Sequence, residues 1–174
     1  MDDFDRIFMI EWIGPFYNVE ELRKWERETP NSNMFCLYLF SGKESHKKFN
    51  SLYCGKSEIG SISTRFKNHS KYELVKDRDF NLWVGRFSDK KAAKSENIDT
   101  VETLIISHWQ PNLNEKKKAY YPGLAICIIN SWYKKDIETR YQNRIYPVQQ
   151  LDDVIFYDIK TNIVWGAERL KKRN

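Results

Sequence analysis

The chain has 174 residues, a formal net charge of +5 and a sequence pI of about 9.0. Its hydrophobic fraction of 41% is enough for a buried core, and its length suits one domain with an extension rather than two full domains. An apolar run of about 18 residues is absent and residues 1–5 are acidic, so we expect neither a membrane-spanning helix nor a secretory signal, and a cytoplasmic location.

The excess of positive charge favours a polyanionic partner such as a nucleic acid. The basic residues gather in four short clusters: Lys43–Lys48, Lys90–Lys94, Lys116–Lys118 and Lys171–Arg173. A single cluster of this kind is typical of a solvated surface, so the composition alone indicates only a weak preference for such a partner.

The N-terminal stretch predicts a strand followed by a helix. Residues Phe4–Tyr17 are mostly apolar and contain Gly14-Pro15, which indicates a strand broken by a turn. Asn18 is a suitable N-cap for a helix that runs from Val19 to about Glu28. We expect both elements to pack against the sheet formed by the next segment.

Two apolar runs that each carry a tyrosine come next. In Met34–Phe40 nearly every residue is apolar, which predicts a strand covered on both faces at the centre of a sheet. Tyr38 is its only side chain with a polar tip. A lysine-rich hairpin loop at Ser41–Asn50 leads back into a second strand, Ser51–Gly55, which carries Tyr53.

Helical spacing marks the following segment, from Ile59 to about Ser70. Three apolar residues recur at positions i, i+3 and i+7 and predict a buried stripe: Ile59, Ile62 and Phe66. Arg65 and His69 are four residues apart, so the same helix would present both on one face beside that stripe.

A third strand and a second long helix are expected after it. Alternation in Phe80–Phe87 predicts the strand, and the helix follows a lysine-rich loop and runs to about Trp109. Asp99 and Glu102 have the spacing of a capping box, which would place Glu102 in the first turn.

The order of the polar residues in this central segment resembles the GIY-YIG nuclease family. Cys36-Leu37-Tyr38 and Tyr53-Cys54-Gly55 stand where the family has its two tripeptides. Three further residues of the family's pattern follow in the same order: Arg65, Glu102 and Asn114. The first glycine and the middle residue of the second tripeptide are cysteines here, and neither replacement removes a side chain that the chemistry needs. The ordered set of five is much more specific than either tripeptide alone.

The resemblance implies an α/β fold of the α+β kind, in which a small antiparallel sheet is flanked by helices. We expect residues 34–118 to form this nuclease core and residues 1–33 to pack on it. Residues 119–174 predict a strand at Leu124–Trp132 and a hairpin at Val154–Trp165. We interpret them as a β-rich C-terminal extension of the same domain.

Hydrolysis of a phosphodiester needs an activated water, charge neutralisation on the phosphate and help for the departing oxygen. By resemblance, Glu102 holds a divalent metal, Mg²⁺ or Mn²⁺, since one carboxylate with phosphate oxygens and waters is a common way to bind Mg²⁺. Arg65 offers a fork of donors to the phosphate. By resemblance, Tyr38 positions or deprotonates the water. Its ordinary pKa near 10 is too high for a base unless a cation such as Arg65 lowers it, and His69 is the rival base.

Further residues complete the predicted site. Tyr53 would line the pocket floor beside Tyr38. Lys56 and Lys67 are candidate contacts for substrate phosphates, and Asn114 would tie the end of the preceding helix to the site through its amide.

The sequence therefore predicts a metal-dependent endonuclease, a hydrolase that cleaves DNA by direct attack of water. RNA is the less favoured substrate, since most members of the resembled family act on DNA. Two alternatives stay open. A non-catalytic nucleic-acid-binding module would keep the fold but would have no use for a lone carboxylate facing a phosphate. A protein-interaction adaptor would use the aromatic C-terminal part as its contact surface.

Overall fold

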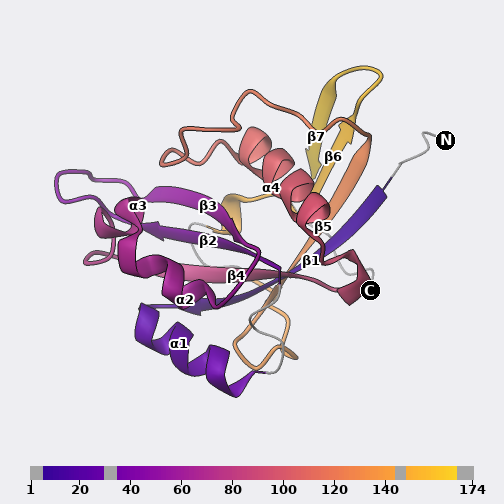
Figure 1. Cartoon of the computed structure of the whole chain (residues 1–174). Coiled ribbons are helices and arrows are strands. Elements are labelled where there is room, and N and C mark those ends of the chain that lie inside the picture. Colours follow the sequence, from indigo (N-terminus) through magenta and orange to yellow (C-terminus); the bar gives the residue numbers. More distant parts are fainter. Residues whose placement is uncertain (1–5, 30–34, 144–147, 168–174) are drawn as a thin grey trace.

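The computed structural model describes residues 6–29, 35–143 and 148–167, and these residues form one curled sheet of seven strands (Figure 1). The acidic start at 1–5 and the basic cluster Lys171–Arg173 lie outside the described residues. The strands are β1 (Arg6–Phe16), β2 (Cys36–Gly42), β3 (Ser51–Ser57), β4 (Asn81–Phe87), β5 (Ile126–Tyr133), β6 (Val154–Asp158) and β7 (Ile163–Ala167). Their order across the sheet is β3-β2-β4-β1-β5-β6-β7, with β1 at the centre.

The sheet contains both antiparallel and parallel strand pairs, whereas the sequence predicted an antiparallel sheet. β1 pairs antiparallel with β4 but parallel with β5, over Arg6–Ile13 against Ile126–Tyr133. The prediction of a small antiparallel sheet flanked by helices, with a β-rich extension beside it, is therefore wrong, because β5, β6 and β7 continue the same sheet. The alternation of apolar and polar residues within a strand shows which of its faces is buried, but not which strands lie beside it. β1 lies between β4 and β5, which are far from it in the chain, so its pairing could not be read from the sequence.

Four α-helices lie in the described parts of the chain: α1 (Val19–Glu28), α2 (Ile62–Arg65), α3 (Ser70–Glu73) and α4 (Ser95–Trp109). Three single-turn 3₁₀ helices accompany them: η1 (Phe66–Asn68), η2 (Lys90–Ala92) and η3 (Val148–Gln150). α1 and α2 pack on one face of the sheet and α4 packs on the other, so the edge strand β3 lies between helices (Figure 1). No helix in the described ranges is long and apolar enough to cross a membrane.

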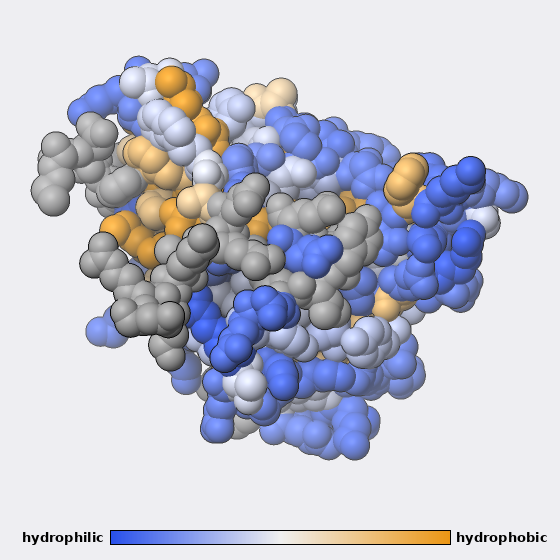
Figure 2. Space-filling model, turned by 180° about the vertical axis from the view of Figure 1, so that it is seen from behind, coloured by the Kyte–Doolittle hydropathy of each residue, from blue (hydrophilic) through white to orange (hydrophobic). Residues whose placement is uncertain are grey.

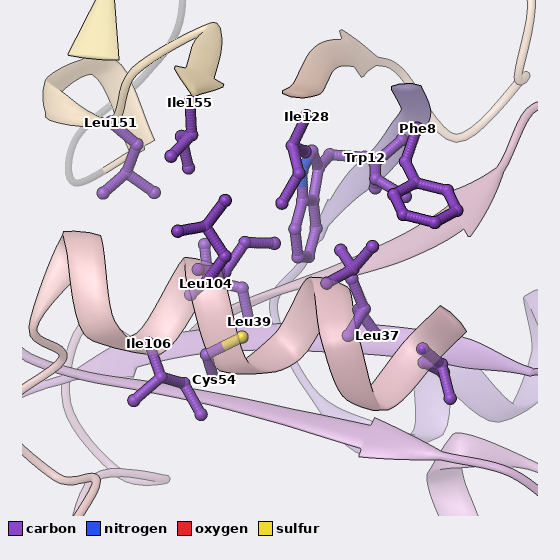
Figure 3. Packing of buried hydrophobic residues seen from close by; sticks show 14 of the residues in the cluster. Phe8, Trp12, Leu37, Leu39, Cys54, Leu104, Ile106, Ile128, Leu151 and Ile155 are labelled. Atoms are coloured by element: carbon purple, nitrogen blue, oxygen red, sulfur yellow. The ribbon is translucent and has the colours of Figure 1, made fainter. Parts of the chain in front are cut away.

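The face of the sheet under α4 holds the larger core. Leu104 and Ile106 of α4 belong to one buried cluster with Leu39 and Cys54 of the β2–β3 hairpin and with Ile155 of β6 (Figure 3). These side chains are nearly inaccessible to solvent, so α4 is held at a defined position over β3. Any polar side chain on this helix is therefore held in place relative to the hairpin that carries the two tyrosines.

On the other face of the sheet, α1 covers the end of β1 through Leu22 and Trp25, whereas the start of β1 and the strands β5, β6 and β7 carry partly exposed side chains there. The register places Ile7, Cys127, Phe156 and Trp165 in one row across these four strands. Ile7 is 60% exposed and Trp165 is 45% exposed. Figure 2 shows apolar surface on this side of the molecule. Helical cover on this face is thus concentrated over the strands that hold the tyrosines.

Several local predictions are confirmed. α1 begins after Asn18, whose Oδ1 accepts a hydrogen bond of 2.8 Å from the backbone N–H of Glu21. β2 is buried at every residue and lies between β3 and β4, as expected of a central strand, although Met34 falls outside the described residues. The hairpin of β6 and β7 also lies where the sequence predicts it.

Two predicted boundaries are wrong. β1 continues through Gly14-Pro15 to Phe16, and only its register against β4 shifts there. α4 begins at Ser95, so Asp99 and Glu102 lie in its interior and form no capping box. Two residues at i and i+3 also share one face of a helix interior, which is why the same spacing misplaced the start of the helix.

The single helix predicted from Ile59 to Ser70 is wrong, because α2, η1 and α3 replace it. Ile59 is 87% exposed, whereas Ile62 and Phe66 are buried as predicted. The helical path is interrupted at His69, whose backbone is extended with φ −91° and ψ 97°. The His69 side chain instead caps α3 by accepting a hydrogen bond from the backbone N–H of Tyr72. Arg65 and His69 therefore come from two different elements.

Candidate active site

An open pocket of about 570 Å³ lies beside the edge strand β3, between the α2–α3 region and the segment that follows α4. It brings together five of the residues that the sequence predicts as catalytic: Tyr38, Tyr53, Arg65, His69 and Asn114. Lys71 and Lys116 also line it, and sequence reasoning did not place them there. Glu102, Lys56 and Lys67 are not among its lining residues.

The two tyrosines share one face of the β2–β3 hairpin. Their rings are stacked with centroids 6.1 Å apart, and the His69 ring stands edge-on to Tyr53 with a centroid distance of 4.8 Å. The register explains this arrangement, since Tyr38 pairs with Gly55 and Phe40 pairs with Tyr53. Tyr38 and Tyr53 are thus diagonal neighbours on the pleated surface, which is within reach of aromatic side chains.

Gly55 makes room for the Tyr38 ring. A Cβ atom at position 55 would lie 2.6 Å from both Cζ and Oη of Tyr38 and 2.9 Å from Cε1 of Tyr53. Because these distances are well below van der Waals contact, a side chain at this position would push the Tyr38 ring away. This explains in physical terms why the second tripeptide ends in glycine.

The hydroxyl of Tyr38 is hydrogen-bonded to the ring of His69. Tyr38 Oη and His69 Nε2 are 3.3 Å apart, and His69 Nδ1 accepts the N–H of Tyr72, also at 3.3 Å. Because Nδ1 is an acceptor, the proton of the neutral imidazole sits on Nε2 and is donated to the Tyr38 oxygen. The hydroxyl hydrogen of Tyr38 is then left for another acceptor. Tyr53 is one such acceptor, since the two tyrosines share a side-chain hydrogen bond, and a ligand in the pocket would compete with it.

Burial sets the protonation of both groups. Burial raises the pKa of Tyr38 above its ordinary value, and the nearby charge of Arg65 only partly opposes this. Burial also lowers the pKa of His69 below its ordinary value, with the charges of Arg65 and Lys71 adding to the effect. At neutral pH the pocket therefore contains a neutral phenol and a neutral imidazole.

Arg65 is the cation best placed to meet a phosphate. Its side chain is exposed and lines the pocket, and within the described part of the chain it forms no ion pair. Lys71, by contrast, forms an ion pair with Glu115 at the rim. Lys67 is exposed on η1, outside the pocket lining. The guanidinium of Arg65 shares a side-chain hydrogen bond with Tyr38, and its remaining donors are open to a ligand.

Glu102 lies on α4, on the other side of β3 from the pocket floor. The residue is only 7% exposed, and its Oε2 accepts a hydrogen bond of 2.7 Å from the ammonium of Lys117. Burial raises the pKa of the Glu102 carboxyl, and Lys117 opposes that shift. The Glu102 charge also contributes to a raised pKa of Tyr53, behind the larger effect of burial. The carboxylate and the pocket are thus electrostatically coupled through the edge strand.

Lys56 belongs to the network around Glu102 rather than to the pocket. Its ammonium lies 2.6 Å from Glu58 Oε1 and 2.9 Å from Asp99 Oδ1, and Asp99 also accepts from Lys117 at 2.7 Å. The ion pairs therefore form a continuous row in space, in which carboxylates alternate with lysines: Glu58, Lys56, Asp99, Lys117 and Glu102. Lys56 has to release two carboxylates before it binds a phosphate.

Both polar atoms of the Asn114 side chain are hydrogen-bonded to the backbone of β3. Its Oδ1 accepts the N–H of Cys54 at 2.9 Å, and its Nδ2 donates to the Cys54 carbonyl at 2.8 Å. Asn112 binds the N–H of Leu52 at 2.6 Å. The two amides continue the hydrogen bonding of the sheet beyond its edge strand. Asn114 thus positions β3, as the sequence predicted for its amide, and Asn112 joins it.

The predicted metal site depends on one carboxylate, that of Glu102. Among the described residues no group of three or more His, Cys, Asp or Glu side chains is arranged to hold a metal ion. Glu102 supplies a hard oxygen donor, the ligand type that Mg²⁺ prefers, and a single carboxylate suffices when phosphate oxygens and waters complete the shell. The donor type therefore fits Mg²⁺ or Mn²⁺ once Lys117 no longer holds Oε2.

Comparison with known proteins adds no relative, since no family model, curated protein or solved structure matches the chain.

Proposed function

We propose that this protein is a divalent-metal-dependent endonuclease that hydrolyses phosphodiester bonds of DNA, with the resemblance to the GIY-YIG family as its first support. The observation that carries the proposal is the pocket beside β3, where an exposed guanidinium, two tyrosines and a neutral imidazole converge. Such a set suits a phosphate and a water better than an apolar ligand.

Each residue has a role in this proposal. Arg65 binds the non-bridging oxygens of the scissile phosphate through its planar fork. Tyr38 donates its hydroxyl hydrogen to the attacking water or to the phosphate, since the His69 proton already occupies one side of its oxygen. Because both groups are neutral at pH 7, Tyr38 orients the reactants rather than accepting a proton as a phenolate. The proton that the attacking water loses passes to solvent water in the open pocket. His69 in turn orients Tyr38.

Glu102 would hold the divalent cation, with Mg²⁺ the expected ion and Mn²⁺ an alternative. Such an ion would supply charge neutralisation and support for the departing oxygen. Because Glu102 lies across β3 from the floor of the pocket, the substrate has to reach around this edge strand. Tyr53 and Asn114 keep β3 and its neighbours in place. Lys116 at the pocket rim is available for an adjacent phosphate, and DNA is the expected substrate.

One observation favours the alternative of a non-catalytic nucleic-acid-binding module. The single carboxylate that would hold the metal is already paired with Lys117. A protein that only binds nucleic acid would keep Arg65 and Lys116 exposed but would have no need of a free Glu102. Cleavage assays separate the two functions directly.

The test is incubation of supercoiled plasmid and single-stranded DNA with Mg²⁺, comparing the wild type with Glu102→Gln. We expect Glu102→Gln to abolish cleavage and to leave DNA binding within about threefold, because the cation ligand is lost while the cations of the pocket remain. Glu96→Gln is the matched control, since Glu96 is exposed on the same helix and pairs with Arg6. Unchanged cutting by Glu102→Gln, or binding without cutting by the wild type, contradicts the proposal.

A further inference from the structure

The ammonium of Lys117 sits where a cation bound to Glu102 would sit. Lys117 Nζ is 2.7 Å from Glu102 Oε2 and 2.7 Å from Asp99 Oδ1. Asp99 and Glu102 are three residues apart on α4 and therefore share a helix face, so one ammonium bridges both carboxylates. Asp99 also pairs with Lys56 at 2.9 Å, whereas Lys117 is the cation that the structure places on Glu102.

Lys117 lies in a segment outside the sheet, so its side chain can leave Glu102 without a change in strand pairing. It lies between α4 and β5, outside every helix and strand, and its backbone is in the left-handed region with φ 67°. Asn114 binds β3 three residues earlier, and the Lys118 carbonyl accepts a hydrogen bond from Gln110. The segment is thus anchored on both sides of a lysine whose long side chain supplies the contact to α4.

A divalent cation and this ammonium compete for the same oxygen. The Glu102 side chain is 9% exposed and the Lys117 side chain is 26% exposed, so the ion pair is shielded from bulk solvent on the Glu102 side. Two positive charges held a few ångströms apart at such a site repel each other strongly, because screening by water is weak there. The lysine has to withdraw before an ion binds with its full charge.

We propose that Lys117 is a built-in competitor for the cation site, which closes the Glu102 carboxylate in the metal-free protein and sets the affinity for the divalent ion. This inference rests on the function proposed above, in which Glu102 is the protein ligand of the cation. Lys117 is then a positioning residue: it pairs with a buried carboxylate and holds it in place until an ion arrives.

The test measures cation binding directly, without DNA. Mn²⁺ binding to the full chain is followed by titration calorimetry and by the loss of the free-ion electron paramagnetic resonance signal, at about pH 8 so that the carboxylates stay ionised. Lys117→Met keeps the length of the side chain and removes its charge. Lys118→Met is the matched control, because Lys118 is the next residue and forms no ion pair among the described residues. Circular dichroism confirms that each variant is folded.

We expect Lys117→Met to bind Mn²⁺ at least about tenfold more tightly than the wild type, in keeping with the coupling measured for close charge pairs. Lys118→Met should bind within about twofold of the wild type, and adding Glu102→Gln to Lys117→Met should abolish the gain. An unchanged or weaker affinity in folded Lys117→Met overturns the inference, as does the absence of Mn²⁺ binding in both proteins.

The outcome for Lys117 is separable from the outcome for the nuclease. If the wild type cleaves DNA with Mg²⁺ and Glu102→Gln does not, while Lys117→Met shows no gain in Mn²⁺ affinity, the competition is refuted and the nuclease stands. If Lys117→Met binds Mn²⁺ more tightly but the wild type cleaves no DNA, the competition stands and the nuclease is refuted.

Discussion

Asn114 offers the sharpest test of how the candidate site is held together. Both polar atoms of its amide bind the backbone of Cys54, at 2.9 Å and 2.8 Å, and the Asn114 residue is 8% exposed. Cys54 is completely buried and lies between Tyr53 and Gly55, the two residues of β3 that surround Tyr38. Asn114→Ala therefore removes the partner of two buried backbone groups at the centre of the site.

The magnitude follows from the number of groups left unpaired. A buried backbone donor or acceptor without a partner costs about 1–2 kcal/mol, so the free energy of unfolding should fall by about 2–4 kcal/mol in Asn114→Ala. For a chain of this size that corresponds to a fall in Tm of roughly 5–12 °C. Loss of cleavage should accompany it, because β3 carries Tyr53 and backs Tyr38.

Urea denaturation followed by tryptophan fluorescence measures the change. Asn112→Ala is the matched control, since Asn112 makes the equivalent bond to Leu52 at 2.6 Å but its side chain is exposed. Water can replace an exposed partner, so Asn112→Ala should cost less than about 1 kcal/mol. The difference between the two variants isolates the effect of burial.

The reasoning is refuted if Asn114→Ala stays within about 0.5 kcal/mol of the wild type. If that variant loses cleavage at unchanged stability, Asn114 contacts the substrate directly and the backbone role is wrong.

Three further predictions concern the pocket itself. Gly55→Ala should displace the Tyr38 ring and cost about 1–3 kcal/mol of stability, because its Cβ would lie 2.6 Å from Tyr38 Oη; a crystal structure of the variant with an unmoved ring would contradict this. Tyr38→Phe should lower the cleavage rate by at least about 100-fold and cost about 1–2 kcal/mol of stability, since the hydroxyl also has Arg65 and Tyr53 as hydrogen-bond partners besides His69. A rate within a few-fold of the wild type would dismiss the role of the hydroxyl. His69 has a lowered pKa in the folded state, so the stability it contributes is present above its unfolded pKa of about 6.5 and is lost as the pH falls through the folded value. Urea denaturation between about pH 7.5 and 5.5 should therefore show a steeper loss of stability for the wild type than for His69→Gln, and parallel curves would rule out the burial effect.

Local patterns decided much of the secondary structure. Asn18 and the apolar run of β2 act through neighbouring residues, and their helix cap and central strand are confirmed. The same kind of pattern failed at residues 59–70, where the apolar spacing predicted one helix. The backbone at His69 is extended and ends the helical path there, although the spacing of the residues gives no sign of it. Asp99 and Glu102 show the same limit, since a spacing of three residues occurs in a helix cap and in a helix interior alike.

The order of residues along the chain predicted five side chains that meet in the pocket: Tyr38, Tyr53, Arg65, His69 and Asn114. It also assigned Glu102, Lys56 and Lys67 to the same site, and these three do not line the pocket. Only the tertiary structure decided that β1 pairs in parallel with β5, and that Lys117 closes the Glu102 carboxylate. The physical reason is the same in both cases. Strand pairing and ion pairs join residues through space, whereas periodicity and spacing describe only the neighbours along one element.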